Sequence, residues 1–458
     1  MTLLIQNGTV VNTDSNKIAD VLCKDGKIIK IEKDLIPDST PDKIIDASNC
    51  YVIPGGIDPH VHMHLPSPAG FSSDDFGSGS RAAIYGGTTT LIDFVTPKKG
   101  QALNDAISQR KSEAANCLTN YAFHVSPVEW RDSMEDEIRN CVNKEGFKSF
   151  KVYMAYKDSI GLNDDVLMKV MKAVSKAGGM VTVHCELGDD IEELRTQFAS
   201  DNKLSPKYHS LSRPAELEAK AVKKAIELAK VANCPLYIVH VSTKASLKYI
   251  SEAQENGQVV MAESCPQYLL LDDSKYNGVF NQVAPFVMSP PLRKPSDNAA
   301  LWEAISNRTV LTVGTDHCPF TQEQKEMGKD DFRKIPNGAG GVEHRLALLF
   351  TYGVLGGRIS MEQFVSITST NASKIFGMFP AKGIIAEGSD ADIVIWNPGK
   401  ENTISVKTHH QNCDMNIYEG IKTKGTPEYV ILDGKVVLEK NRLSQDIRKG
   451  SLLKTKPF

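Results

Sequence analysis

Hydrophobic residues follow one pattern at both ends of the chain and another in the middle. The N-terminal part consists of short apolar segments separated by turns, LLIQNGTVVN, ADVLCKDGKIIKIE and KIIDASNCYVI, and the C-terminal part repeats this with ADIVIWNP and EYVILDGKVVLE. Their Asn-Gly and Asp-Gly pairs are strong signals for β-hairpin turns. Since chain ends often lie close together, residues 1–52 and 386–458 are predicted to form one small β-sandwich domain.

The middle of the chain, residues 53–385, alternates between apolar runs and amphipathic stretches. The strand-like runs are TTTLIDFV, SFKVYMAY, MVTVHCE, PLYIVHVS, VVMAESC and TVLTVGTDHC. The helix-like stretches are NDAISQRKSEAANC, DDVLMKVMKAVSKAGG, AELEAKAVKKAIELAKVAN and KASLKYISEAQENG. This alternation is typical of a parallel α/β sheet, and its length favours a (β/α)8 TIM-like barrel over an open sheet. No Gly-x-Gly-x-x-Gly follows a strand and no P-loop is present, which disfavours the nucleotide-binding α/β folds.

Composition narrows the class of protein further. The 458 residues are 41% hydrophobic and 24% charged with a net charge of -3, so a basic face for nucleic acid or an anionic membrane is not expected. No apolar run is long enough to span a bilayer, and the N-terminus lacks the pattern of a signal peptide. The nine cysteines are scattered without a CxxC pair. These features predict a protein of the reducing cytoplasm.

Polar residues gather where the predicted barrel strands end. Active sites of such barrels form at the carboxyl ends of the strands, so these side chains are expected to converge. A lone histidine in a strand is more often structural, but His-x-His followed by further strand-end residues favours a metal site. Imidazole and carboxylate ligands suit zinc, and less exclusively manganese, iron or cobalt. The predicted ligands are His60, His62, His184, His240 and Asp316.

Four other residues near these ligands are less favoured as metal ligands. Cys185 should point away from the site because neighbouring strand residues face opposite sides. For Cys318, core packing is the preferred interpretation, although it could line the pocket. His64 continues the alternation after His62 and lies at or past the strand end, and His124 is favoured as a structural residue.

Lys151 is the anomalous residue of the pattern, because it places an ammonium within the apolar run SFKVYMAY. A buried ammonium is costly unless it is paired or deprotonated. Pairing with a carboxylate is the ordinary solution. Beside four histidines and an aspartate, a carbamate formed from the neutral amine and CO2 is the better account, since its two oxygens bridge two cations. A binuclear centre with metals about 3.5–4 Å apart is then expected.

Together these motifs resemble the dihydropyrimidinase and D-hydantoinase family of cyclic amidohydrolases. The motifs are GGIDPHVH, SFKVYMAYK, VHCE, IVHVS, GTDHC, FRKIPNGAGGVEHR and NASKIFGMFPAKGIIAEGSDADIVIW. The resemblance covers nearly the whole chain and implies a barrel, a β-sandwich built from both ends, and two Zn²⁺ per chain. It implies one zinc on His60, His62 and Asp316, a second on His184 and His240, and carboxylated Lys151 as the bridge.

The family also implies a mechanism and a substrate pocket. Hydroxide from the metal pair would open a cyclic amide to an N-carbamoyl amino acid, with Asp316 moving the proton and Tyr156 stabilising the oxyanion. Ser289 in MSPPLR and Asn337 in IPNGAGG match positions that hold the cyclic amide, largely through backbone groups. The family is commonly tetrameric, so a homotetramer is expected, with a dimer as the alternative.

Several relatives of this family stay open as alternatives. Dihydroorotases usually carry an arginine where this chain has His64, which counts against an anionic substrate. Allantoinase is harder to separate by motif. Non-catalytic scaffold members of the collapsin response mediator type lack metal ligands, whereas all six positions are filled here. The stretch HLPSPAGFSSDDF, residues 64–76, departs from the usual family sequence, so the choice between a 5,6-dihydropyrimidine and a 5-substituted hydantoin is open. The expected pocket lining is Met63, Leu65, Phe71 and residues 153–157.

Overall fold

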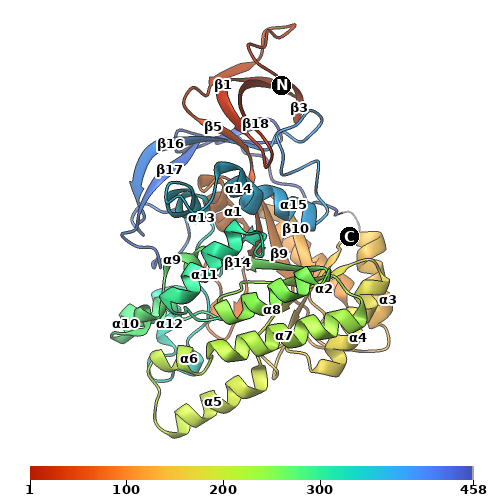
Figure 1. The fold of residues 1–458 in the computed structure, drawn as a ribbon, viewed down its shortest axis with the longest axis vertical. Coiled ribbons are helices and arrows are strands. Elements are labelled where there is room, and N and C mark those ends of the chain that lie inside the picture. The colour runs from red at the N-terminus through yellow and green to blue at the C-terminus, as the bar shows by residue number, and fades with distance from the viewer. Residues whose placement is uncertain (456–458) are drawn as a thin grey trace.

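The computed structural model describes residues 1–455 and has two parts, a barrel and a smaller β domain (Figure 1). Eight parallel strands pair side by side in chain order around the barrel. Val61 of the first strand pairs with His317 beyond the last, and the His62 amide donates to the His317 carbonyl at 2.8 Å. The nearly closed α/β barrel confirms the predicted fold. Its strands are β6 (Gly56–Val61), β9 (Thr88–Val95), β10 (Asn120–Val125), β11 (Ser149–Tyr153), β12 (Met180–His184), β13 (Leu236–Ile238), β14 (Val260–Ser264) and β15 (Thr312–Val313).

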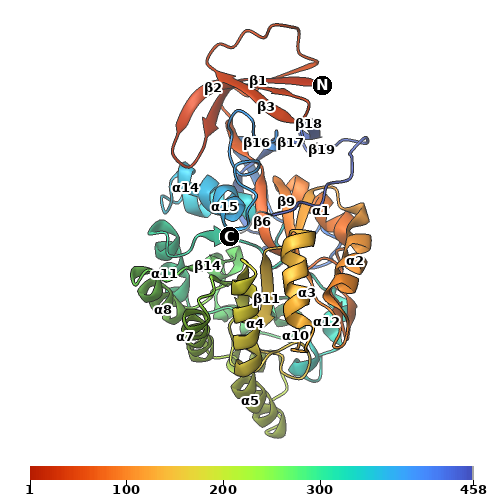
Figure 2. The same ribbon diagram turned by 90° about the vertical axis from the view of Figure 1, so that its right-hand side faces the viewer.

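Helices cover the outside of the barrel, and the four predicted amphipathic stretches all form helices (Figures 1 and 2). In α4 (Asp164–Lys176) the Asn163 side chain accepts from the Val166 amide and begins the helix, and the apolar face with Leu167 and Val170 is buried. The other helices around the strands are α1 (Phe76–Tyr85), α2 (Leu103–Glu113), α3 (Met134–Asn140), α7 (Ala215–Ala232), α8 (Lys244–Glu255) and α11 (Pro295–Ser306).

The remaining helices and two short strands lie in the connections between these elements. They are β7 (Pro66–Ser67), β8 (Gly70–Phe71), α5 (Gly188–Ser200), α6 (Lys207–Leu211), α9 (Pro266–Leu270), α10 (Phe280–Val283), α12 (Gln322–Glu326), α13 (Arg345–Leu349), α14 (Met361–Val365) and α15 (Asn371–Ile375). The longest of these, α5, projects from the end of the molecule opposite the β domain (Figure 1). Within residues 1–455, none of the helices has the length and apolar character needed to cross a membrane.

The β domain joins strands from both chain ends, as predicted, in one nine-stranded sheet. Asp25-Gly26 and Asp433-Gly434 form the predicted hairpin turns, each with φ of 49° at aspartate and 75–84° at glycine. The prediction of a turn at Asn7-Gly8 is wrong. The strand continues through this pair as a bulge, with Asn7 at φ 63° and its amide bound to Asp20. The strands are β1 (Thr2–Val11), β2 (Asn16–Lys24), β3 (Lys27–Glu32), β4 (Lys43–Asp46), β5 (Tyr51–Pro54), β16 (Ile393–Thr403), β17 (Lys422–Leu432), β18 (Lys435–Glu439) and β19 (Arg442–Leu443).

After β19 the chain returns to the barrel. The Tyr121 amide at the start of β10 donates to the Ser451 carbonyl, and the Leu453 amide donates to the Tyr121 carbonyl. Figure 2 shows this end of the chain beside the barrel rather than in the β domain. The last three residues of the predicted β-sandwich segment, 456–458, lie outside the described residues.

Candidate metal centre and active site

His60 and His62 at the end of β6 both reach one oxygen of Asp316. The Nε2 atoms lie 3.2 Å and 3.1 Å from Oδ1 of Asp316. Asp316 follows β15 with φ 53°, a left-handed conformation that is costly outside glycine and concentrates at functional sites. Burial alone would raise the pKa of this carboxyl, but the imidazoles of His60 and His62 outweigh it and lower the pKa. The three side chains therefore form one predicted half of the site.

His184 and His240 form the other half. His184 ends β12, whereas His240 lies just beyond β13 at φ 39°, and Nδ1 of His184 is 2.9 Å from Nε2 of His240. Ligand atoms of His60, His240 and Asp316 all lie within 4.8 Å of one another, so the two halves are continuous. The buried Nε2 of His60 lies 3.2 Å from Asp316 Oδ1 but makes no hydrogen bond within residues 1–455. Imidazole nitrogens and a carboxylate gathered in this way fit divalent metal ions.

Lys151 lies in β11 on the inner side of the same barrel wall and is 1% exposed. Its Nζ lies 4.9 Å from the ring centroid of Phe94 and 5.1 Å from that of Tyr153. No carboxylate of residues 1–455 forms an ion pair with it. Burial lowers the pKa of the amine to about 8. The ordinary alternative, a structural ion pair, is therefore absent from the part of the chain that is described.

Two buried glutamates that the sequence reasoning missed hold the outer nitrogens of the histidines. Glu263 of β14 faces Nδ1 of His60 at 2.7 Å and accepts from the Tyr237 hydroxyl at 2.8 Å. Glu186 faces Nε2 of His184 at 2.9 Å. A neutral histidine that donates to its glutamate presents the other nitrogen's lone pair to the cluster. The sequence did contain a signal for Glu263, because an acidic residue within the apolar run VVMAESC is unusual.

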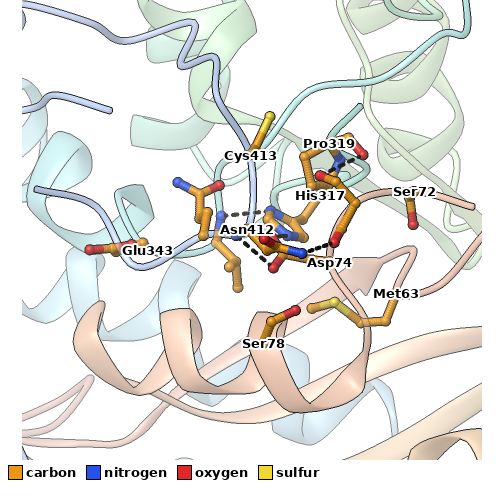
Figure 3. Close-up of polar contacts among 12 residues, drawn as sticks. Met63, Ser72, Asp74, Ser78, His317, Pro319, Glu343, Asn412 and Cys413 are labelled. Carbon is orange, nitrogen blue, oxygen red and sulfur yellow. Dashed lines mark hydrogen bonds and ion pairs between the residues drawn. The ribbon is translucent and has the colours of Figure 1, made fainter. Parts of the chain in front are cut away.

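Asp316 is followed by another buried histidine, His317, which was also missed. Its Nε2 is 3.0 Å from Asp74 Oδ2, and its Nδ1 accepts from the Gly341 amide at 3.0 Å. Asp74 also accepts from the Asn412 amide at 2.9 Å, and Figure 3 shows it between His317 and Asn412. His317 is thus held from both ring nitrogens, which fixes the backbone beside Asp316.

The three predicted substrate residues lie beside this cluster. The Tyr156 ring centroid is 5.3 Å from that of His184, and Tyr156 has φ 59°. Burial raises the pKa of its hydroxyl, whereas the Arg213 guanidinium and a hydrogen bond with Ser289 lower it, with a net rise. The Asn337 side chain donates to the Ser289 hydroxyl at 3.1 Å. The structure therefore brings Tyr156, Ser289 and Asn337 together, from three separate connections of the barrel.

Other candidates lie outside the cluster or pack against its back. His64 stacks on Phe71, with ring centroids 3.8 Å apart. His124 binds the Ser149 hydroxyl at 2.6 Å and the Pro59 carbonyl at 2.9 Å, which is a structural role. Met63, expected in the pocket, is fully buried in the main hydrophobic cluster. Cys185 is buried in the same cluster, as expected for packing.

Comparison with known proteins places this arrangement in a family. Residues 51–437 match the Amidohydrolase family. The chain is 43% identical to a D-hydantoinase of Geobacillus stearothermophilus over 96% of this chain and 93% of the relative. It is 41% identical to a dihydropyrimidinase of Rattus norvegicus over 100% of this chain and 89% of the relative.

Among solved structures, the dihydropyrimidinase from Brevibacillus agri superposes with a TM-score of 0.98. It is 41% identical, and the match covers 100% of this chain and 99% of that one. The sequence resemblance is therefore confirmed at the level of fold and of full-length similarity. The chain belongs to the amidohydrolase family and, within it, to the dihydropyrimidinase and D-hydantoinase group of cyclic amidohydrolases.

Proposed function

We propose that this protein is a binuclear zinc hydrolase that opens a 5,6-dihydropyrimidine or 5-substituted hydantoin ring to an N-carbamoyl amino acid. The observation that carries the proposal is the convergence of four histidines and Asp316 on one buried point next to Lys151, which pairs with no carboxylate of residues 1–455. The named relatives, D-hydantoinases and dihydropyrimidinases, support the choice of a cyclic amide.

Six side chains would hold the metal pair. One ion would be held by the histidines of β6 with Asp316, the other by the histidine pair of β12 and β13, and carboxylated Lys151 would bridge them. Two observations support this assignment: the buried Nε2 of His60 makes no hydrogen bond within residues 1–455, and two ring nitrogens of His184 and His240 face each other. When bound, such a pair supplies a water of lowered pKa and polarises the amide carbonyl. The proposed ligands are His60, His62, Lys151, His184, His240 and Asp316.

The remaining chemistry falls to residues of the chain. The water oxygen adds to the ring carbonyl carbon while the Asp316 carboxylate takes the water's proton. The Tyr156 hydroxyl donates to the developing oxyanion, which matches a phenol kept protonated by burial. The C–N bond then breaks, and Asp316 returns the proton to the leaving nitrogen. Ser289 and Asn337, which lie beside Tyr156, hold the cyclic amide.

Glu263 and Glu186 orient the proposed metal ligands and do not contact the substrate. By accepting from the outer nitrogens of His60 and His184, they fix which nitrogen of each ring faces the cluster. The Glu186 carboxylate is itself held by Arg213 at 2.5 Å. Zinc as the metal, the homotetramer and the cytoplasmic location remain predictions from the sequence.

The test combines metal content with a substrate panel. Purified protein should hold about two divalent metals per chain, since two-metal sites of this kind act as a unit. Initial rates are measured on 5,6-dihydrouracil, a 5-aryl hydantoin and allantoin, with the metal-chelated protein as the control. Turnover of either of the first two, with the N-carbamoyl product identified by mass spectrometry, supports the proposal. Less than one metal per chain without turnover contradicts it, and a preference for allantoin reassigns the substrate.

A further inference from the structure

Lys325 is a second buried lysine, and it lies outside the metal cluster. It belongs to the short helix α12 and is 1% exposed. Its Nζ donates to three backbone carbonyls, those of Val287 at 2.8 Å, Pro336 at 2.7 Å and Gly338 at 2.9 Å. No carboxylate within residues 1–455 forms an ion pair with it. An ammonium has three N–H donors and no acceptor, so three carbonyls satisfy it completely.

The three carbonyls belong to the two loops that carry the proposed substrate residues. Val287 lies two residues before Ser289, and Pro336 and Gly338 flank Asn337. The loops also touch directly, since the Gly338 amide donates to the Val287 carbonyl at 3.0 Å. The Lys325 ammonium is therefore the point where the backbones of both loops meet.

Gly338 shows how closely the backbones pack at this point. Its φ is 143°, and a Cβ added there would lie 2.3 Å from the Cys318 carbonyl oxygen. Only glycine allows the loop to approach so near. The Cys318 amide donates to the Ala339 carbonyl at 2.9 Å, which joins the same loop to the segment after Asp316. The loop thus has little freedom to change its spacing from the metal cluster.

The neighbouring residue on α12 reaches a third segment. The Gln324 side chain donates to the carbonyls of Ala69 at 3.0 Å and Phe71 at 2.7 Å, within residues 64–76. Its carbonyl oxygen accepts from the Thr321 amide at 2.9 Å and begins the helix. Gln324 and Lys325, which are consecutive in α12, thus bind the 64–76 segment and both substrate loops, respectively.

We propose that Lys325 is a positioning residue that sets the spacing of the Ser289 and Asn337 loops and thereby the affinity for the cyclic amide. The inference rests on the proposed function, because that assigns these two loops to the substrate. The hydrogen bonds of Lys325 go to backbone carbonyls and not to the side chains of Ser289, Asn337 or the proposed metal ligands. Its loss should therefore weaken substrate binding while the metal pair and the chemical step remain.

The test is Lys325→Met, which keeps the volume and removes all three donors. We expect KM to rise about 10-fold or more with kcat within about twofold, the pattern of lost binding energy. Metal content should stay at the wild-type value. Lys325→Gln, which keeps two N–H donors, should give an intermediate KM. If Lys325→Met fails to fold, Lys325→Gln is judged by the same measurements.

Lys382→Met is the matched control. Lys382 is also buried, at 5% exposed, but it pairs with Asp392 at 2.5 Å and Asp390 at 3.0 Å, away from both substrate loops. The Lys382→Met substitution should lower the unfolding midpoint and leave KM unchanged. The inference is overturned if fully metallated Lys325 variants keep the wild-type KM, or if Lys382→Met raises KM equally. An inactive wild-type protein would instead contradict the proposed function.

Discussion

Lys151 in the barrel wall and Lys325 beneath the substrate loops are buried to the same extent, yet they have opposite surroundings. Burial lowers the pKa of both amines, to about 8 for Lys151 and about 7 for Lys325, so acidity alone does not separate them. The acceptors do. Lys325 has three carbonyls within 2.9 Å, whereas Lys151 has two aromatic rings and the histidine cluster. The N–H donors of Lys325 are all taken up by backbone carbonyls, whereas no carboxylate of residues 1–455 pairs with Lys151, which leaves its amine available for modification.

The comparison also separates chemistry from positioning. The Lys151 side of the site is made of strand residues that point into the barrel, where a neutral amine can become a ligand. The Lys325 side is made of loops whose carbonyls need a donor, because buried backbone groups without partners are costly. Under the proposals above, the same residue type would serve a reaction in one region and a fixed loop geometry in the other.

The largest effect is expected from Lys151→Ala. It should lose the metal pair and reduce kcat/KM by about 10³-fold or more, since even one lost oxyanion donor costs about 10²–10³. A short carboxylic acid should restore part of the activity by standing in for the carbamate. Metals per chain and initial rates check this, with Lys325→Met as the matched control that keeps its metals. Full activity of Lys151→Ala would refute the bridge.

Tyr156→Phe should have the next largest effect. It removes one hydroxyl beside the cluster and keeps the ring that packs on His184, so the metals stay bound. We expect kcat to fall about 10²–10³-fold with a small change in KM, as for loss of an oxyanion donor. An equal rise in KM with unchanged kcat would assign Tyr156 to substrate binding instead.

Glu263→Gln tests the outer layer of the metal centre. The amide keeps the shape of the carboxylate but weakens the contact that orients His60 at 2.7 Å. Metal affinity should fall about 10–100-fold, the usual cost of losing such a partner. Competition with a chelator measures this, and activity should return at high metal concentration. Wild-type affinity in this variant would show that His60 is oriented without Glu263.

Sequence patterns correctly located the strands that carry the candidate ligands. His60, His62 and Lys151 lie in or beside strands, where the period of two fixes which side chains share a face. His240 and Asp316 lie just past their strands at positive φ, and the apolar runs still located them within a few residues. The fold followed from the same alternation of strands and helices.

The loop side could not be predicted from local patterns. Lys325 lies in the charged stretch QEQKEMGKDD, which is typical of a solvated surface, and only the fold buries it. Ser289 and Asn337 were predicted as substrate residues through the family resemblance rather than through any periodicity. The Asn7-Gly8 pair shows the same limit, because long-range contacts turned a hairpin signal into a bulge.

The smallest effect concerns stability and pH. An unfolded lysine has a pKa of about 10.4, so between pH 7 and pH 9 the unfolded chain holds a proton that folded Lys325 gives up. The stability of wild type relative to Lys325→Met should therefore rise with pH above 7, by at most about 1.4 kcal/mol per pH unit, and stay level below it. The facing thiols, Cys318 and Cys413, have pKa values raised by burial, so they add little in this range.

Lys382 should behave in the opposite way. Burial alone would lower its pKa, but Asp392 and Asp390 outweigh it and raise the pKa above that of the unfolded chain. Its contribution to stability is therefore fully present across pH 7–9, and wild type minus Lys382→Met should not vary there. Guanidinium unfolding midpoints of the three proteins at pH 6.5, 7.5 and 9 check both statements. A level difference for Lys325→Met would mean that the three carbonyls keep the ammonium charged throughout, so the loops would remain fully clamped at alkaline pH.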